Sequence, residues 1–129
     1  MLANQGQAAE AVTMLAAVSA ANTAAATSAW IDVRKYEGDL VILQSAGILT
    51  GTLTPTIEDA TDGAGAGGAA FTGLNEGPFT VVTTSNDPLQ EKRTIPAGST
   101  RGWIRYVGTI VTGPAPLAVT LLAHPKYTA

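Results

Sequence analysis

The sequence predicts an all-β protein: a single-domain antiparallel β-sandwich or jelly-roll-like barrel with an extended N-terminal arm. Two observations support this fold class. Short apolar or alternating stretches of strand length recur along the chain, and clusters of Gly, Pro, Asn and Asp separate them. No strand–helix–strand unit is visible between them. The length of 129 residues fits one domain, which we assign to residues 12–129.

The N-terminal region divides into two parts. Residues 1–11 contain few large apolar side chains and many Ala and Gln, so they predict a flexible arm that could order against a partner. Residues 12–29 are ambiguous, because their alanines favour a helix while the alternation over residues 12–19 allows a strand. We favour the strand, since helical spacing gives a poor apolar stripe.

The next elements are predicted in chain order. Alternation over residues 30–36 predicts a strand, and YEGD at residues 36–39 predicts a turn. Residues 40–46 form an apolar run that ends at Gly47, and the Thr-rich residues 48–58 suit a strand in which Pro55 indicates an edge or a bulge.

The second half predicts four more strands. These are residues 78–84, 89–95, 101–112 and 117–124. The turns predicted between them are SNDP at residues 85–88, PAGS at 96–99 and GPAP at 113–116.

A glycine-rich segment, DGAGAGGAAF, lies between these halves. Its Gly63, Gly65 and Gly68 match the G-x-G-x-x-G spacing of dinucleotide-binding turns. Such a turn needs a helix directly after the glycines, because the helix N-terminus carries the pyrophosphate. Gly73 and the Gly77–Pro78 pair leave no room for a useful helix. We therefore interpret the segment as a flexible loop between two strands and predict no cofactor.

Other chemical groups are sparse. Glu58, Asp59 and Asp62 could bind a hard cation such as calcium, but a solvated acidic loop is the favoured interpretation. His124 is the only histidine and lies at a predicted strand end, and the chain has no cysteine. We therefore predict no catalytic or metal-binding residue and a function other than catalysis.

Composition bounds the partners. A net charge of -3 argues against a nucleic-acid surface, which needs clustered Lys and Arg. The N-terminus lacks the pattern of a secretory signal, and no apolar stretch is long enough to predict a membrane span. Only 13% of residues are charged. This predicts either a surface covered by partners or further copies, or a surface of Thr, Ser, Asn and Gly.

Large aromatic residues on the predicted strands are candidates for contacts. Trp30, Tyr36, Trp103 and Tyr106 lie on these strands, and such residues are usually core or interface. Aromatic side chains on a β-sandwich can also stack against sugar rings. A carbohydrate-binding module is therefore an alternative interpretation.

A resemblance to a known family adds to this interpretation. The stretch from Trp30 to Gly38 has an aromatic-x-D-V strand leading into Y-E-G. An apolar strand and a Thr-rich strand ending at Glu58 and Asp59 come next, and the R-Y-V strand at residues 105–107 precedes a turn and a final apolar strand. Over about residues 12–126, this pattern resembles the small capsid decoration, or cement, proteins of tailed bacteriophages.

The resemblance implies a non-enzymatic virion protein on the outer surface of a phage head. It would bind the major capsid protein, bridge neighbouring capsid subunits and associate with other copies of itself as a homotrimer, without a cofactor. The alternative is a carbohydrate-binding or phage fibre or tail module. Candidate capsid or inter-subunit contacts are Leu2, Asn4, Gln5, Gln7, Trp30, Tyr36 and Trp103. Three arms on one trimer would bind with the advantage of multivalency.

Overall fold

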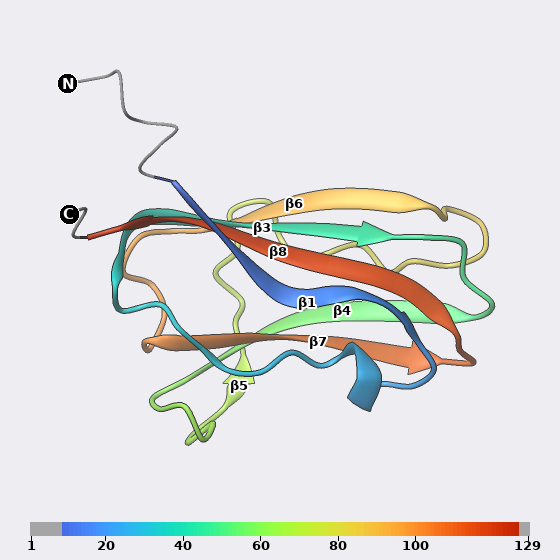
Figure 1. The fold of residues 1–129 in the computed structure, drawn as a ribbon, viewed down its shortest axis with the longest axis horizontal. Coiled ribbons are helices and arrows are strands. Elements are labelled where there is room, and N and C mark those ends of the chain that lie inside the picture. Colours follow the sequence, from blue (N-terminus) through green and yellow to red (C-terminus); the bar gives the residue numbers. More distant parts are fainter. Residues whose placement is uncertain (1–8, 127–129) are drawn as a thin grey trace.

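The computed structural model describes residues 9–126, which form two antiparallel sheets packed face to face (Figure 1). Each sheet has four strands, in the order β1-β8-β3-β6 for sheet A and β2-β7-β4-β5 for sheet B. The strands are β1 (Glu10–Ala20), β2 (Ile31–Asp32), β3 (Tyr36–Ala46), β4 (Thr52–Ala60), β5 (Ala69–Ala70), β6 (Leu89–Ile95), β7 (Trp103–Val111) and β8 (Ala115–Pro125). The prediction of an all-β sandwich is confirmed.

The order of the strands is that of a jelly roll. β1 pairs with β8, β2 with β7, β3 with β6 and β4 with β5, and all four pairs are antiparallel. A long antiparallel ribbon folded over on itself gives this pairing, and its two halves then face each other across one core. This arrangement occurs in capsid and lectin domains, so the fold alone does not decide between these functions.

The first strand starts earlier than predicted. β1 begins at Glu10, so the last two residues of the predicted arm belong to the sheet, where Glu10 pairs with Ala123. The strand interpretation of residues 12–29 is confirmed only as far as Ala20. A short 3-10 helix, η1 (Ala24–Ala26), comes next, because Thr27 and Ser28 then bond to β7 instead of continuing β1.

The predicted turn at residues 36–39 is wrong. Tyr36 already starts β3, and the register with β8 shifts between Glu37 and Val41. Gly38, at a φ of 73°, takes the left-handed conformation that glycine adopts without steric cost. The glycine therefore marks an irregularity within a strand rather than a turn. Of the strand predicted over residues 30–36, only the two residues of β2 are observed as a separate strand.

The predicted strand over residues 78–84 is also wrong. This segment forms one isolated bridge, Val82 to Leu53, rather than a ladder. A carboxylate replaces a neighbouring strand here, since the Thr80 N–H and hydroxyl both donate to Glu91, at 2.9 and 2.6 Å. The segment therefore lies along the side of β6 and β4 without pairing fully with either.

The remaining strands agree with the sequence pattern to within a few residues. β6, β7 and β8 cover most of the stretches predicted at residues 89–95, 101–112 and 117–124. Pro55 lies on β4 between Leu53 and Ile57, whose backbone groups bond to Val82 and Phe71 on that side. Proline lacks an N–H, so it suits this point, where the chain beside β4 leaves the sheet.

Aliphatic side chains from both sheets fill the core, and one polar pair crosses it. Ile42, Leu121, Ile57 and Ile104 are at most 1% exposed. In the same layer, the Tyr106 hydroxyl on sheet B donates to Gln44 Oε1 on sheet A at 2.6 Å. Burial raises the pKa of Tyr106, so the phenol stays protonated and able to donate.

Candidate interaction surfaces

The outer face of sheet A is almost free of charge. It consists of the residues that alternate with the buried ones: Ala11, Thr13 and Ser19 of β1, Pro116, Ala118, Thr120 and Leu122 of β8, Val41, Leu43 and Ser45 of β3, and Gln90, Lys92 and Thr94 of β6. Two charged residues lie on this side at its margins: Lys92 on β6, and Glu37 at the start of β3, where it pairs with His124 of β8. Most charged side chains of the described chain thus lie elsewhere.

Small side chains make this face flat and partly apolar. Leu43 is 38% exposed near its centre, opposite Thr120 of β8. Two shallow hollows lie beside Ala118, one against Leu43 and the other against Pro116. A flat face of Ala, Ser, Thr and Leu suits contact with another protein better than it suits enclosure of a small molecule.

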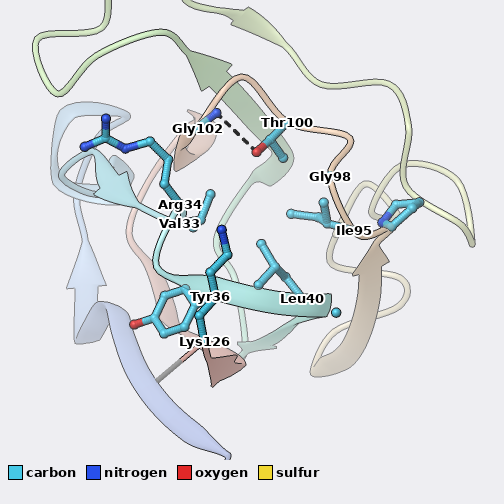
Figure 2. A pocket seen from close by; sticks show the side chains of 11 residues that line it. Val33, Arg34, Tyr36, Leu40, Ile95, Gly98, Thr100, Gly102 and Lys126 are labelled. Carbon is cyan, nitrogen blue, oxygen red and sulfur yellow. Dashed lines mark hydrogen bonds between the residues drawn. The ribbon is translucent and has the colours of Figure 1, made fainter. Parts of the chain in front are cut away.

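A pocket opens at one end of the sandwich (Figure 2). At this end β1 starts and β8 finishes (Figure 1). It has a volume of about 220 Å³. Val33, Leu40 and Ile95 form its apolar part together with Tyr36. The loop from β6 to β7 supplies the other wall, including Thr100.

Among the described residues, two cations and no carboxylate line this pocket. Figure 2 shows Lys126 extending past Tyr36 with its ammonium among the lining residues, and Arg34 at the border. The guanidinium of Arg34 is already engaged, since it pairs with Asp32 at 2.8 Å and stacks on the Trp103 ring at 5.4 Å. This pairing lowers the pKa of Asp32 to about 2.

The glycine-rich loop of residues 61–68 folds against the two tryptophans. A Cβ on Gly65 would lie 2.7 Å from Trp30 Nε1, and one on Gly63 would lie 2.9 Å from the Trp103 ring. The positive φ of Gly65, 86°, adds a second reason for glycine. The prediction of a loop between strands is confirmed, and close packing on indole rings explains the spacing that resembles a cofactor motif.

The tryptophans offer little free surface for a sugar. The Arg105 guanidinium lies 4.6 Å from the centre of the Trp30 ring, and the Arg34 guanidinium lies 5.4 Å from the centre of the Trp103 ring. Both indoles are half-buried. Each therefore has a cation against one ring and loop glycines against its edge, rather than an open stacking platform.

The three carboxylates considered as a cation site point to separate partners. Glu58 accepts from Arg105 at 2.7 Å, and Asp59 pairs with Arg101 at 3.0 Å. Asp62 accepts the backbone N–H groups of Ala66 and Ala64, which lowers its pKa and shapes the loop. Within residues 9–126 no group of three His, Cys, Asp or Glu side chains is arranged to hold a metal ion.

The structure places the predicted contact residues in different environments. Trp30 and Trp103 lie together on the outer side of sheet B, whereas Tyr36 is 6% exposed, lines the end pocket and donates a hydrogen bond from its hydroxyl to Glu10 at 3.1 Å. Leu2, Asn4, Gln5 and Gln7 lie outside the described residues.

Sequence reasoning missed both the outer face of sheet A and the end pocket. The LAVTLLAH stretch of residues 117–124 carried the signal for the outer face, because neither of its two alternating sets holds an acidic or permanently charged residue. The pocket had no such signal, since its walls come from residues 33–40, 95–102 and 126.

No family model matches the chain, and no curated protein is significantly similar to it. Among solved structures, the SPBc2 prophage-derived protein YomS matches with a TM-score of 0.54 at 12% identity, covering 89% of this chain and 91% of that one. At this identity the similarity shows a shared fold alone.

Two further matches are more distant. A protein of Bacillus endospore appendages, described as a novel family of disulfide-linked pili, matches with a TM-score of 0.46 at 14% identity over 91% of this chain and 86% of that one. A family 29 carbohydrate-binding module from Piromyces equi matches with 0.45 at 9% identity over 88% and 90%. Both are too distant to bear on function.

The described residues also contain no helix with the length and hydropathy that a bilayer-spanning segment requires.

Proposed function

We propose that this protein is a non-enzymatic capsid decoration protein, which binds the outer surface of a phage head, bridges major capsid subunits and stabilises the shell. The observation that carries the proposal is the outer face of sheet A, which spans four strands and has uncharged side chains at its centre, with Lys92 and Glu37 at its margins. A face of this kind gains free energy when a flat protein surface removes it from water.

Two further observations support a role in assembly. The chain resembles decoration proteins in the order of its strand motifs, and its jelly roll is shared with a prophage-derived protein. In the part of the chain that the structure describes, three of the four ion pairs lie on and around sheet B, among them Arg101–Asp59 and Arg105–Glu58, whereas the outer face of sheet A has none.

A homotrimer is part of this proposal. Three copies on a local three-fold axis would present three equivalent faces and three arms, so that weak individual contacts act together. The carbohydrate-binding alternative is less favoured, because Arg105 and Arg34 lie against the indole rings of Trp30 and Trp103.

The test is cosedimentation with head shells assembled from the major capsid protein encoded in the same genome. We expect the protein to move with the shells at saturable stoichiometry and to raise the temperature at which they disrupt. Protein that stays at the top of the gradient at high concentration would contradict the proposal. A glycan array tests the alternative, for which we expect no signal above background.

A further inference from the structure

The end pocket is the feature that the proposed function leaves unused. Its volume of about 220 Å³ is below the roughly 300–1,000 Å³ typical of sites for drug-sized ligands. It is lined by Val33, Tyr36, Leu40 and Ile95, so it has room and apolar surface for a single side chain. A protruding residue of another protein fits this space better than a cofactor does.

The mouth of the pocket is open on the side of the loops. Gly38 and Gly98 line it with φ values of 73° and 70°, and a Cβ at either position would meet nothing within 4 Å. The positive φ favours glycine, which leaves the rim low. An incoming chain can therefore approach closely with its backbone.

The charged residues at the pocket indicate which kind of partner it would bind. Lys126 reaches into the pocket in Figure 2, and its backbone N–H donates to the carbonyl of Lys35 at 2.8 Å, so the two lysines are neighbours. No ion pair of either lysine occurs within the described residues, whereas four arginines have carboxylate partners.

The carboxylates nearby are engaged or face away. Asp32 is held by Arg34, Asp39 accepts the N–H of Ala97 at 2.9 Å, and Glu10 bonds to the Tyr36 hydroxyl. Glu37 comes directly after the inward-facing Tyr36 on the strand, so it lies on the opposite side of β3. Asp39 and Glu10 keep their negative charge, because their hydrogen-bond donors are neutral, but neither lines the pocket. Among the described residues, Lys126 is therefore the charged lining residue that has no ion pair.

We propose that this pocket docks an acidic segment of a partner protein, which inserts one aliphatic side chain and places a flanking carboxylate against Lys126 and Lys35. The inference rests on the proposed function in one respect: the partner that it would contact in a virion is the capsid shell. It adds a specific anchoring point to the flat contact of sheet A, which by itself fixes orientation poorly.

The test is an NMR titration of the full chain with the peptide Ac-Glu-Leu-Glu-NH2, compared with Ac-Gln-Leu-Gln-NH2. We expect saturable shifts at the amides of Gly98, Thr100 and Gly102 with the acidic peptide. The neutral peptide should bind about fivefold more weakly, as expected for loss of one partly exposed ion pair. The K35Q/K126Q double variant should lose the same factor for the acidic peptide.

The K92Q variant is the matched control, because Lys92 lies on the outer side of sheet A and does not line the pocket. It should bind the acidic peptide as the parent protein does, and the amide spectrum reports whether each variant is folded. The inference is overturned by absent or unsaturable shifts at the three amides, by equal affinity for both peptides, or by an unaltered K35Q/K126Q variant.

Shell binding separates this inference from the proposed function. If the parent protein and K35Q/K126Q cosediment with shells equally well, the pocket has no anchoring role and the proposed function stands. If the parent protein does not bind shells, the proposed function fails, and the peptide titration alone decides whether the pocket binds acidic segments.

Discussion

The buried pair between the two sheets gives the sharpest stability prediction. Gln44 and Tyr106 are 2% and 0% exposed, and Gln44 Nε2 makes no hydrogen bond with the described residues. Replacing Tyr106 with Phe would leave the whole amide of Gln44 unpaired in the core. Replacing Gln44 with Leu would instead leave the Tyr106 hydroxyl unpaired.

The expected magnitudes depend on the polar groups that each variant leaves unpaired. An unsatisfied buried group costs about 1–3 kcal/mol, so Y106F should lower the free energy of unfolding by about 2 kcal/mol. Q44L should lower it by about 1 kcal/mol, because it leaves the Tyr106 hydroxyl unpaired but also removes the unpaired Nε2. Replacing both partners with apolar groups is nearly neutral or stabilising. The Y106F/Q44L double variant also removes the unpaired Nε2, so it should be about as stable as the parent protein.

The assay is urea unfolding of the four proteins as a double-mutant cycle. We expect a coupling energy of about 3 kcal/mol, at the upper end for residues in contact. Single variants that each cost less than about 0.5 kcal/mol would refute the reasoning, because this is the range of surface substitutions. A double variant whose loss is the sum of the single losses would refute it equally.

Three further predictions concern the loop, the pH dependence and the arm. Gly65→Ala should destabilise the protein by more than the roughly 1–2 kcal/mol of left-handed strain, because its Cβ also meets Trp30, and it should alter Trp fluorescence. The control is Gly77→Ala, at a φ of 84° with nothing within 4 Å of its Cβ, which should show the strain alone. Equal losses of stability in the two variants would exclude a role for the indole contact. Burial and the hydrogen bond to Glu10 raise the pKa of Tyr36 from 10.0 to about 12, so its contribution to stability should be complete below pH 10 and lost as the pH rises to 12. Tyr36→Phe should therefore flatten the decline of the denaturant midpoint with pH, and an unchanged decline would contradict the role of Tyr36. Deleting residues 1–8 should leave the unfolding midpoint unchanged and weaken shell attachment, whereas full attachment would exclude the arm from binding.

The alternation of apolar and polar residues predicted a strand correctly where that strand has one buried and one exposed side. β6, β7 and β8 alternate as expected and lie close to their predicted bounds. The pattern failed where side chains replace backbone partners, as Glu91 does for Thr80. It also failed at Gly38, since glycine in an irregular strand and glycine in a turn have the same sequence signature.

The candidate sites depend on contacts that are distant in sequence. The glycine spacing at residues 63–68 could be excluded as a cofactor motif because residues 69–78 cannot form a helix, but its packing on Trp30 and Trp103 became visible only in the folded chain. Likewise, the sequence predicts Tyr36 as a contact residue, but only the folded chain shows that its ring faces inward and lines the end pocket. Aromatic residues on strands do not reveal which side they face when the register is irregular.

The most direct test of the central claim, that the outer face of sheet A contacts the capsid, is shell cosedimentation of a charge variant. Ala118→Arg places an unpaired cation in the middle of this face, whereas Thr54→Arg places the same group on the outer side of sheet B. The account predicts that A118R binds shells at least tenfold more weakly, a loss of about 1.4 kcal/mol, while T54R binds normally. Normal binding by A118R, or an equal loss in both variants, would contradict it.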